Sequence, residues 1–218
     1  VFGGTTMENK RFALCINRQY GSGGRSVGKL LAAELGIDFY DEKILTITSE
    51  ISAIGEQYFR LADEKAGSNI LYKVFDNLKP ALSEPTTGFN LTNRDNLFRF
   101  QAKMLRELAA NESCIIAGRA ADYILKEANV TDVISVYVYC DIEKKIERIK
   151  ELEVIDSAAA EKKVIQKDKG RAEFYNYYTG RIWDDCSHYD LCINTTNLNY
   201  EQIAEIIKDY IRIRGYEI

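Results

Sequence analysis

Apolar residues in this chain form short runs that alternate with longer stretches in which they recur every three or four positions. The short runs predict buried strands at 12–16, 37–40, 114–117, 133–140 and 189–194. The longer stretches predict helices at 27–35, 41–54, 93–110 and 141–152, a long helix that opens at Ser157, and a last helix at 199–210. Asn199, with Gln202 three residues later, predicts a cap at the start of this last helix. Because strands alternate with helices, the pattern indicates an α/β fold with a parallel sheet and helices on both faces.

Two stretches interrupt this alternation within a single domain of residues 7–218. Residues 55–92 have helical apolar spacing that breaks at Gly67-Ser68 and again in a turn-rich stretch holding both prolines of the chain. We interpret 55–92 as a helical substrate-binding insertion. Residues 157–181 combine clustered cations with aromatic residues, and we interpret them as a mobile lid that closes over a polyphosphate. Residues 1–6, which precede Met7, are interpreted as a disordered end or an expression remnant.

A glycine-rich turn joins the first predicted strand to the first predicted helix. This order points backbone N–H groups and the positive end of a helix at a phosphate. We therefore predict that the phosphates of ATP bind at Gly21, Ser22, Gly23, Gly24, Arg25 and Ser26, with Mg²⁺ on the Ser26 hydroxyl. The turn departs from the Walker A pattern, because no lysine stands between Gly24 and Ser26. The alternative is a turn that only connects a strand to a helix.

Charged residues beyond the predicted strands are further candidates for the site. Arg119 follows the strand at 114–117, and ligands of open α/β sheets bind beyond the carboxyl ends of strands. It is predicted to hold a phosphate, and a structural ion pair is the alternative. Asp41 follows the strand at 37–40 and is explained equally well as a substrate ligand or as a helix N-cap. Arg99, on the helix at 93–110, is also expected to bind substrate.

The predicted lid adds further cations. Asp168 stands there among basic residues that include Lys167, Lys169 and Arg171. Like charges four residues apart on a helix repel, so a polyphosphate between them would tighten the segment. We predict that Asp168 and Arg171 bind substrate and that Lys167 and Arg171 assist transfer. The alternative is an ordinary charged helix face exposed to water.

Composition narrows the classes of function. The 218 residues are 46% hydrophobic and 28% charged, as in ordinary globular proteins, and the net charge of -4 argues against a nucleic-acid coat. No apolar run approaches a membrane span and no signal peptide is visible, so we expect a cytoplasmic protein without a membrane partner. The five cysteines lack paired spacing, which predicts reduced thiols. The single histidine, His188, argues against zinc and against histidine-dependent catalysis.

Six segments taken together carry a resemblance to a known family, and they are residues 18–25, 36–41, 116–122, 168–171, 177–180 and 189–194. With them the sequence resembles the cytidylate kinase-like family, within the P-loop nucleoside monophosphate kinases, over nearly the whole chain after Met7. The resemblance implies a P-loop NTPase-type three-layer sandwich with a five-stranded parallel sheet in the order 2-3-1-4-5. It also implies ATP on the glycine loop, a helical monophosphate-binding region and a basic lid.

The resemblance implies a small-molecule kinase that transfers the ATP γ-phosphoryl group to a nucleoside monophosphate, CMP-like, or to a similar phosphorylated acceptor. Arg25 and Arg119 would be catalytic cations, together with Lys167 and Arg171. The sequence departs from authentic cytidylate kinases where their phosphate-gripping lysine falls, at Gly24 or Arg25. It also departs at three polar positions, now occupied by Ile47, Ala117 and Ala120.

These departures predict weak selectivity for CMP over UMP. A non-catalytic nucleotide or anion sensor, and a kinase for an unrelated metabolite, stay open as alternatives. The protein is expected to be a monomer or a homodimer.

Overall fold

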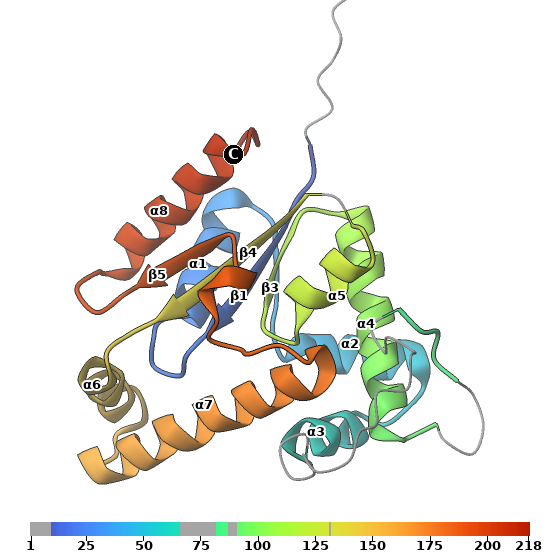
Figure 1. The fold of residues 1–218 in the computed structure, drawn as a ribbon, viewed down its shortest axis with the longest axis horizontal. Helices are drawn as coiled ribbons and strands as arrows, with labels where there is room; N and C mark the ends of the chain where they lie inside the picture. The colour runs from blue at the N-terminus through green and yellow to red at the C-terminus, as the bar shows by residue number, and fades with distance from the viewer. Residues whose placement is uncertain (1–9, 66–81, 87–90, 131) are drawn as a thin grey trace, which may run out of the picture.

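Five short apolar runs form one parallel sheet in the order β2-β3-β1-β4-β5, which confirms the predicted order (Figure 1). The computed structural model describes residues 10–65, 82–86, 91–130 and 132–218. The strands are β1 Ala13–Arg18, β2 Asp38–Tyr40, β3 Cys114–Ala117, β4 Val133–Tyr139 and β5 Leu191–Asn194. β1 lies in the centre, where Cys15 pairs with Ile116 of β3 on one side and Ser135 of β4 on the other.

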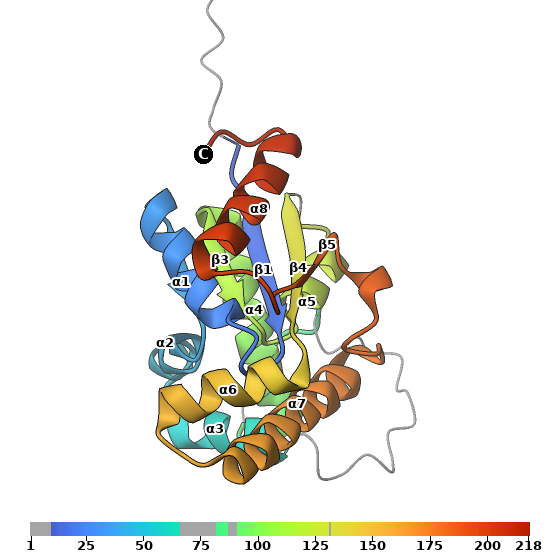
Figure 2. The ribbon, with the colours of Figure 1, turned by 90° about the vertical axis from the view of Figure 1, so that its left-hand side faces the viewer.

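Helices cover both faces of this sheet. Their bounds are α1 Gly24–Leu35, α2 Lys43–Ser52, α3 Glu56–Lys65, α4 Arg94–Asn111, α5 Ala121–Glu127, α6 Ile142–Glu153, α7 Ser157–Thr179 and α8 Tyr200–Ile213, with a short 3-10 turn at Cys186–His188. α1 and α8 pack on one face, and α4 and α5 lie on the other (Figures 1 and 2). α6 and α7 lie together beyond the carboxyl ends of the strands (Figure 2).

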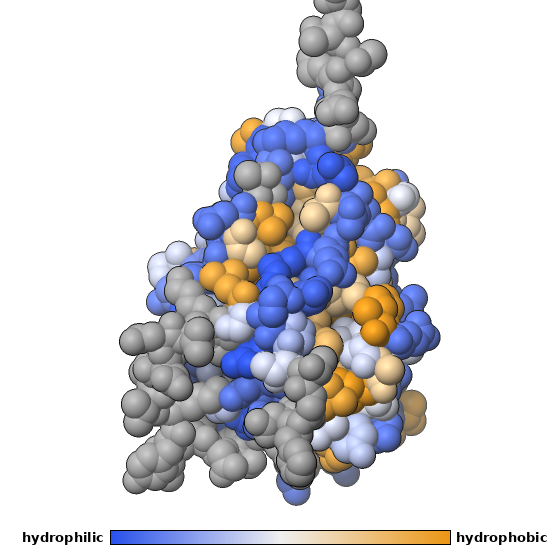
Figure 3. All heavy atoms as spheres, turned by 90° about the vertical axis from the view of Figure 1, so that its right-hand side faces the viewer, coloured by the Kyte–Doolittle hydropathy of each residue, from blue (hydrophilic) through white to orange (hydrophobic). Residues whose placement is uncertain are grey.

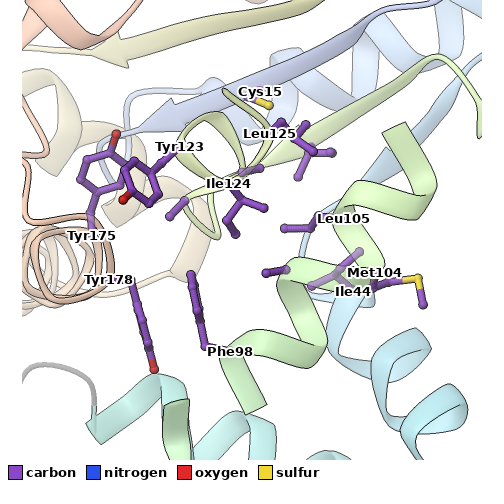
Figure 4. Close-up of a cluster of buried hydrophobic side chains, with 14 of the residues drawn as sticks. Cys15, Ile44, Phe98, Met104, Leu105, Tyr123, Ile124, Leu125, Tyr175 and Tyr178 are labelled. Carbon is purple, nitrogen blue, oxygen red and sulfur yellow. The ribbon is translucent and has the colours of Figure 1, made fainter. Parts of the chain in front are cut away.

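The core on the α4 and α5 face also fixes the end of α7. There Phe98 of α4 stacks on Tyr178 of α7, with ring centroids 3.8 Å apart and planes within 6° (Figure 4). Ile124 and Leu125 of α5 are fully buried in the same cluster. The carboxyl end of α7 is therefore part of the core, while its amino end lies beside α6.

Capping residues explain where several helices begin and end. Gly36 ends α1 in the left-handed conformation, and the Asn93 side chain caps α4 by accepting a hydrogen bond from the Asp95 N–H. Asn199 and Gln202 form the complete capping box of α8, as the sequence predicts.

Some boundaries differ from the sequence prediction. β5 begins at Leu191 rather than at residue 189, and α2 begins at Lys43 rather than at residue 41. α5 was not predicted, because Ala121 through Leu125 are all buried and leave no apolar and polar period to read. Of the predicted insertion at 55–92, α3 and residues 82–86 and 91–92 are described, and the remainder lies outside the described residues.

No helix within the described ranges is long and apolar enough to span a membrane. The face shown in Figure 3 carries hydrophobic side chains in separate small groups between hydrophilic ones.

Candidate functional site

The glycine loop leaves β1 at Arg18 and enters α1, whose N-cap is Gly23. Gly21 and Gly23 have φ angles of 80° and 88°, which glycine adopts without strain. Among the described residues, no acceptor binds the N–H groups of Gly21, Gly23 or Gly24. Three amides at the positive end of α1 are thus available to an anion.

The outer side of the loop is held by Arg148 of α6. Its guanidinium donates to the carbonyls of Gly21 and Ser22 at 3.3 and 3.1 Å, and to the Thr195 carbonyl at 3.0 Å. The loop carbonyls therefore face α6. α6 also lies so close that a Cβ on Gly21 would stand 2.9 Å from the Lys145 carbonyl oxygen.

α7 contacts the same loop through Asp168 and Arg171. Asp168 Oδ1 accepts a hydrogen bond of 2.6 Å from the Tyr20 N–H, and its Oδ2 lies 3.1 Å from Lys145 Nζ. Arg171 donates to the Arg18 carbonyl at 3.0 Å. Both oxygens of Asp168 thus bind the protein itself, so the structure gives this residue a positioning role, and its predicted contact with substrate stays a prediction.

Arg119 stands in an unusual turn at the carboxyl end of β3. Gly118, Arg119 and Ala120 all have left-handed φ angles, of 78°, 63° and 53°. A non-glycine residue pays about 1–2 kcal/mol for this conformation. Burial lowers the pKa of the Arg119 guanidinium, although the carboxylates of Glu42 and Asp41 favour its charged form. The structure thus places Arg119 at the predicted edge of the sheet, and its contact with phosphate stays a prediction.

Asp41 and Arg25 form a two-pronged ion pair. Arg25 Nε and Nη2 lie 2.8 and 2.6 Å from Asp41 Oδ2, and the Lys43 N–H donates to Oδ1 at 3.3 Å. Burial alone would raise the pKa of Asp41, but the hydrogen bonds from Arg25 and Lys43 outweigh it and hold the pKa below its usual range. Asp41 is therefore joined to the glycine loop and also contacts the first turn of α2.

Sequence reasoning assigned no role to Arg18, the last residue of β1. Its side chain runs past Gly24 towards Gly118, because a Cβ on Gly24 would lie 2.6 Å from Arg18 Cβ and one on Gly118 would lie 2.2 Å from Arg18 Nη1. Arg18 Nε is buried without a hydrogen-bond acceptor among the described residues. The available signal was its position five residues before Gly23, where the Walker A pattern has its first glycine.

The remaining predicted residues are spread more widely. Ser26 is exposed in the first turn of α1, and Lys167 is exposed on α7. Arg99 belongs to α4, which packs against α2 and α5, and its Nε is buried without an acceptor in the described part of the chain. Its predicted contact with substrate stays a prediction.

A cavity of about 460 Å³ opens beside the Arg25–Asp41 pair. It carries charges of both signs and one aromatic ring, and its lining residues are Arg25, Lys29, Asp38, Phe39, Asp41, Glu42, Lys43, Thr46 and Arg60. Three of these residues, Asp41, Glu42 and Arg60, also act electrostatically on Arg119. The cavity and Arg119 therefore belong to one region at the carboxyl edge of the sheet.

A glycine loop with free amides and the arginines Arg18, Arg25 and Arg119 thus lie at the carboxyl end of the parallel sheet. A model of the cytidylate kinase-like family matches residues 13–197. The chain belongs to the cytidylate kinase-like family. The cytidylate kinase of Sulfurisphaera tokodaii is 27% identical over 202 residues, which cover 91% of this chain and 94% of that enzyme.

Another relative matches over a shorter length. The cytidylate kinase of Methanococcus aeolicus is 32% identical over 101 residues, so the match spans 46% of this chain and only 57% of that enzyme. Among solved structures, an uncharacterized protein from Eubacterium ventriosum has a TM-score of 0.65 at 25% identity, covering 93% of this chain and 99% of its own. A shikimate kinase from Bacteroides thetaiotaomicron has a TM-score of 0.52 at 15% identity over 92% of this chain and 98% of its own, and it shares the P-loop kinase fold.

Proposed function

We propose that this chain transfers the γ-phosphoryl group of ATP, supplied as its Mg²⁺ complex, to a nucleoside monophosphate such as CMP or to a similar phosphorylated acceptor. The observation that carries this proposal is the set of free amides at Gly21, Gly23 and Gly24, in the loop that follows the carboxyl end of β1, at the same edge of the sheet as Arg119 and the cavity. This chain belongs to the cytidylate kinase-like family and its relatives are named cytidylate kinases, which supports a phosphotransferase.

In this reaction an oxygen of the acceptor phosphate forms a bond to the γ-phosphorus of ATP. The bond from that phosphorus to the oxygen bridging the β- and γ-phosphates breaks, and ADP leaves with the electron pair. The reaction needs positioning and charge neutralisation rather than a strong base. Amides and arginines at this edge of the sheet are suited to both tasks, because they hold anionic oxygens in fixed directions.

The proposed roles follow from position. The loop amides would hold the ATP phosphates, Arg119 would hold the acceptor phosphate, and Arg171 on α7 would neutralise charge at transfer. For Mg²⁺, the hydroxyl of Ser26 is exposed, but the Walker A hydroxyl position, two residues after Gly23, is occupied by Arg25. Ser26 is one residue further, about 100° around α1. The residues present therefore match a Mg²⁺ site less well than the loop amides match a phosphate site.

The acceptor base would enter the cavity lined by Phe39 and by charges of both signs. Ala117 and Ala120, which stand at positions that are polar in cytidylate kinases, are buried at 2% and 1% exposure and present no hydrogen-bonding side chain. Sites that hydrogen-bond a substrate group can discriminate by about 10⁴, and sites without such groups cannot. We therefore expect kcat/KM values for CMP and UMP within about tenfold of each other. A preference for CMP near 10⁴ would contradict this.

The proposal is tested by measuring ADP release with Mg²⁺-ATP and CMP, dCMP, UMP or AMP as acceptor. Turnover that depends on the acceptor supports a kinase. A thermal-shift titration with the same compounds measures binding separately. Binding of ATP without acceptor-dependent ADP release would instead identify the sensor that stays open as the alternative.

A further inference from the structure

Arg18 occupies a place that the Walker A pattern gives to glycine. In that pattern the first glycine comes five residues before the last, and lysine follows the last glycine directly. With Gly23 as the N-cap of α1, the first position falls on Arg18 and the lysine position falls on Gly24. The chain has therefore exchanged the two residue types, with the cation at the end of β1 and glycine at the start of α1.

The exchange is consistent with the packing. The absent Cβ of Gly24 leaves room for the Arg18 stem, since a Cβ there would lie 2.6 Å from Arg18 Cβ and 3.3 Å from Val138 Cβ. The absent Cβ of Gly118 leaves room for the guanidinium, 2.2 Å from Nη1. The Arg18 side chain thus crosses from the glycine loop to the turn that presents Arg119, and it lies between the proposed donor and acceptor sites.

The electrostatic surroundings of Arg18 lack a matching anion. The cations Arg171, Arg119 and Arg25 all disfavour its charge, and Asp41 alone among its chief neighbours favours it. Asp41 already binds Arg25 through both Nε and Nη2. The buried Nε of Arg18 has no acceptor among the described residues. A buried, charged donor without a partner costs free energy unless a ligand supplies the anion.

We propose that Arg18 grips the phosphate chain of ATP in this protein and replaces the lysine that a Walker A loop carries on its helix. The proposal rests on the proposed function, because it names a further residue of the same site. A guanidinium presents several fixed N–H donors, so it can bind two phosphate oxygens at once, which an ammonium on a flexible stem does less readily.

The first test is Arg18→Met, which retains an unbranched apolar stem and removes the charge. Calorimetric titration with inorganic tripolyphosphate, without nucleotide, should show a Kd at least tenfold weaker than that of the unchanged protein. The melting temperature without ligand should stay the same or rise, because a cation is removed from a cluster of cations. Arg212→Met is the control, since Arg212 is exposed on α8 and pairs with Asp209, and its Kd should not change. A lower melting temperature with an unchanged Kd would make Arg18 a structural residue and overturn the proposal.

The second test moves the cation back to the helix. Gly24→Lys alone should abolish tripolyphosphate binding, because its Cβ collides with the Arg18 stem. Arg18→Gly combined with Gly24→Lys removes that collision and restores the Walker A order, and it should bind within about tenfold of the unchanged protein. A double variant that folds but binds no better than Arg18→Met would contradict the exchange.

The two proposals can fail separately. If the unchanged protein releases no ADP with any acceptor, the kinase function fails, yet loss of tripolyphosphate binding in Arg18→Met still assigns the phosphate grip to Arg18. If turnover is seen and Arg18→Met retains both its rate and its Kd, the kinase stands and the role of Arg18 is refuted. If both proposals hold, Arg18→Met should lower kcat about 100-fold or more.

Discussion

The turn Gly118-Arg119-Ala120 holds three consecutive residues in the left-handed conformation, which is strained for the non-glycine residue Arg119. Two substitutions at Arg119 can therefore separate the role of its guanidinium from the cost of its backbone conformation. Arg119→Gly removes the guanidinium and relieves the strain, whereas Arg119→Ala removes the guanidinium alone. We expect both variants to weaken acceptor binding or turnover by about 1.5–3 kcal/mol. The free energy of unfolding of the glycine variant should exceed that of the alanine variant by about 1 kcal/mol, as measured by urea titration. Unchanged steady-state kinetics in both would restrict Arg119 to a structural role.

The Arg25–Asp41 pair gives a pH-dependent prediction. The pKa of Asp41 is depressed in the folded state, so its stabilisation is present above the unfolded pKa and is lost as the pH falls through the folded pKa. Asp41→Asn should lower the free energy of unfolding by about 1–2 kcal/mol at pH 7. The difference from the unchanged protein should shrink below about pH 4. Urea unfolding at both pH values measures this, and a difference that grows on acidification would contradict it.

At the scale of elements, α7 joins the glycine loop to the core. Its carboxyl end packs through Tyr178 against Phe98, while Asp168 and Arg171 bind the loop backbone. Tyr20 and Lys163 both bind Glu153 at the end of α6, so α6 and α7 are also linked to each other. A ligand that engages the loop would therefore act directly on this helix.

We predict that hydrogen exchange in residues 162–180 slows when an ATP analogue binds. Asp168→Asn should speed exchange in the same residues without ligand, because it weakens contacts of a charged group that are worth about 1.5–3 kcal/mol. Lys169→Ala is the matched control, since Lys169 is 73% exposed and its 3.8 Å pair with Glu173 contributes little. Identical exchange with and without the analogue would leave α7 as a charged surface helix rather than a lid.

At the scale of the whole molecule, a buried carboxylate joins three elements. Asp122 of α5 accepts hydrogen bonds from Asn17 of β1 at 2.8 Å and from the Tyr175 hydroxyl of α7 at 2.7 Å. Burial raises the pKa of Asp122, and the two hydrogen bonds favour its charged form. The network therefore ties β1, the strand that leads into the glycine loop, to α7, the helix whose Asp168 and Arg171 contact that loop.

Tyr175→Phe should destabilise the protein by about 1–3 kcal/mol at pH 7, because the carboxylate loses a donor. A folded pKa above the unfolded value means that stability is fully present below the unfolded pKa and is lost as the pH rises through the folded one. Loss of the donor raises the folded pKa further, so the destabilisation should be smaller at pH 4 than at pH 7. Urea unfolding of Tyr175→Phe measures this, with Tyr58→Phe as control, since Tyr58 is 45% exposed. A larger loss at pH 4 would contradict the prediction.

Local patterns were enough to predict most elements, because burial repeats with the period of the element that causes it. The strand at 114–117 was predicted with its correct bounds, and the capping box of Asn199 and Gln202 was read from two residues three positions apart. The glycine turn predicted a strand, a loop and a helix in the correct order. The sheet order and the family came from the resemblance of several such segments taken together.

Only the tertiary structure could reveal the features that depend on residues distant from one another in the chain. α5 is buried on all sides, so no local period marks it. The contact of Asp168 with Tyr20 spans 148 residues, and the pairing of Arg25 with Asp41 depends on β2 ending at the edge of the sheet where α1 begins. In the sequence, Arg18 is marked only by its spacing of five residues from Gly23. Its path past Gly24 to Gly118 exists only because the parallel strands β1 and β3 bring their carboxyl ends together.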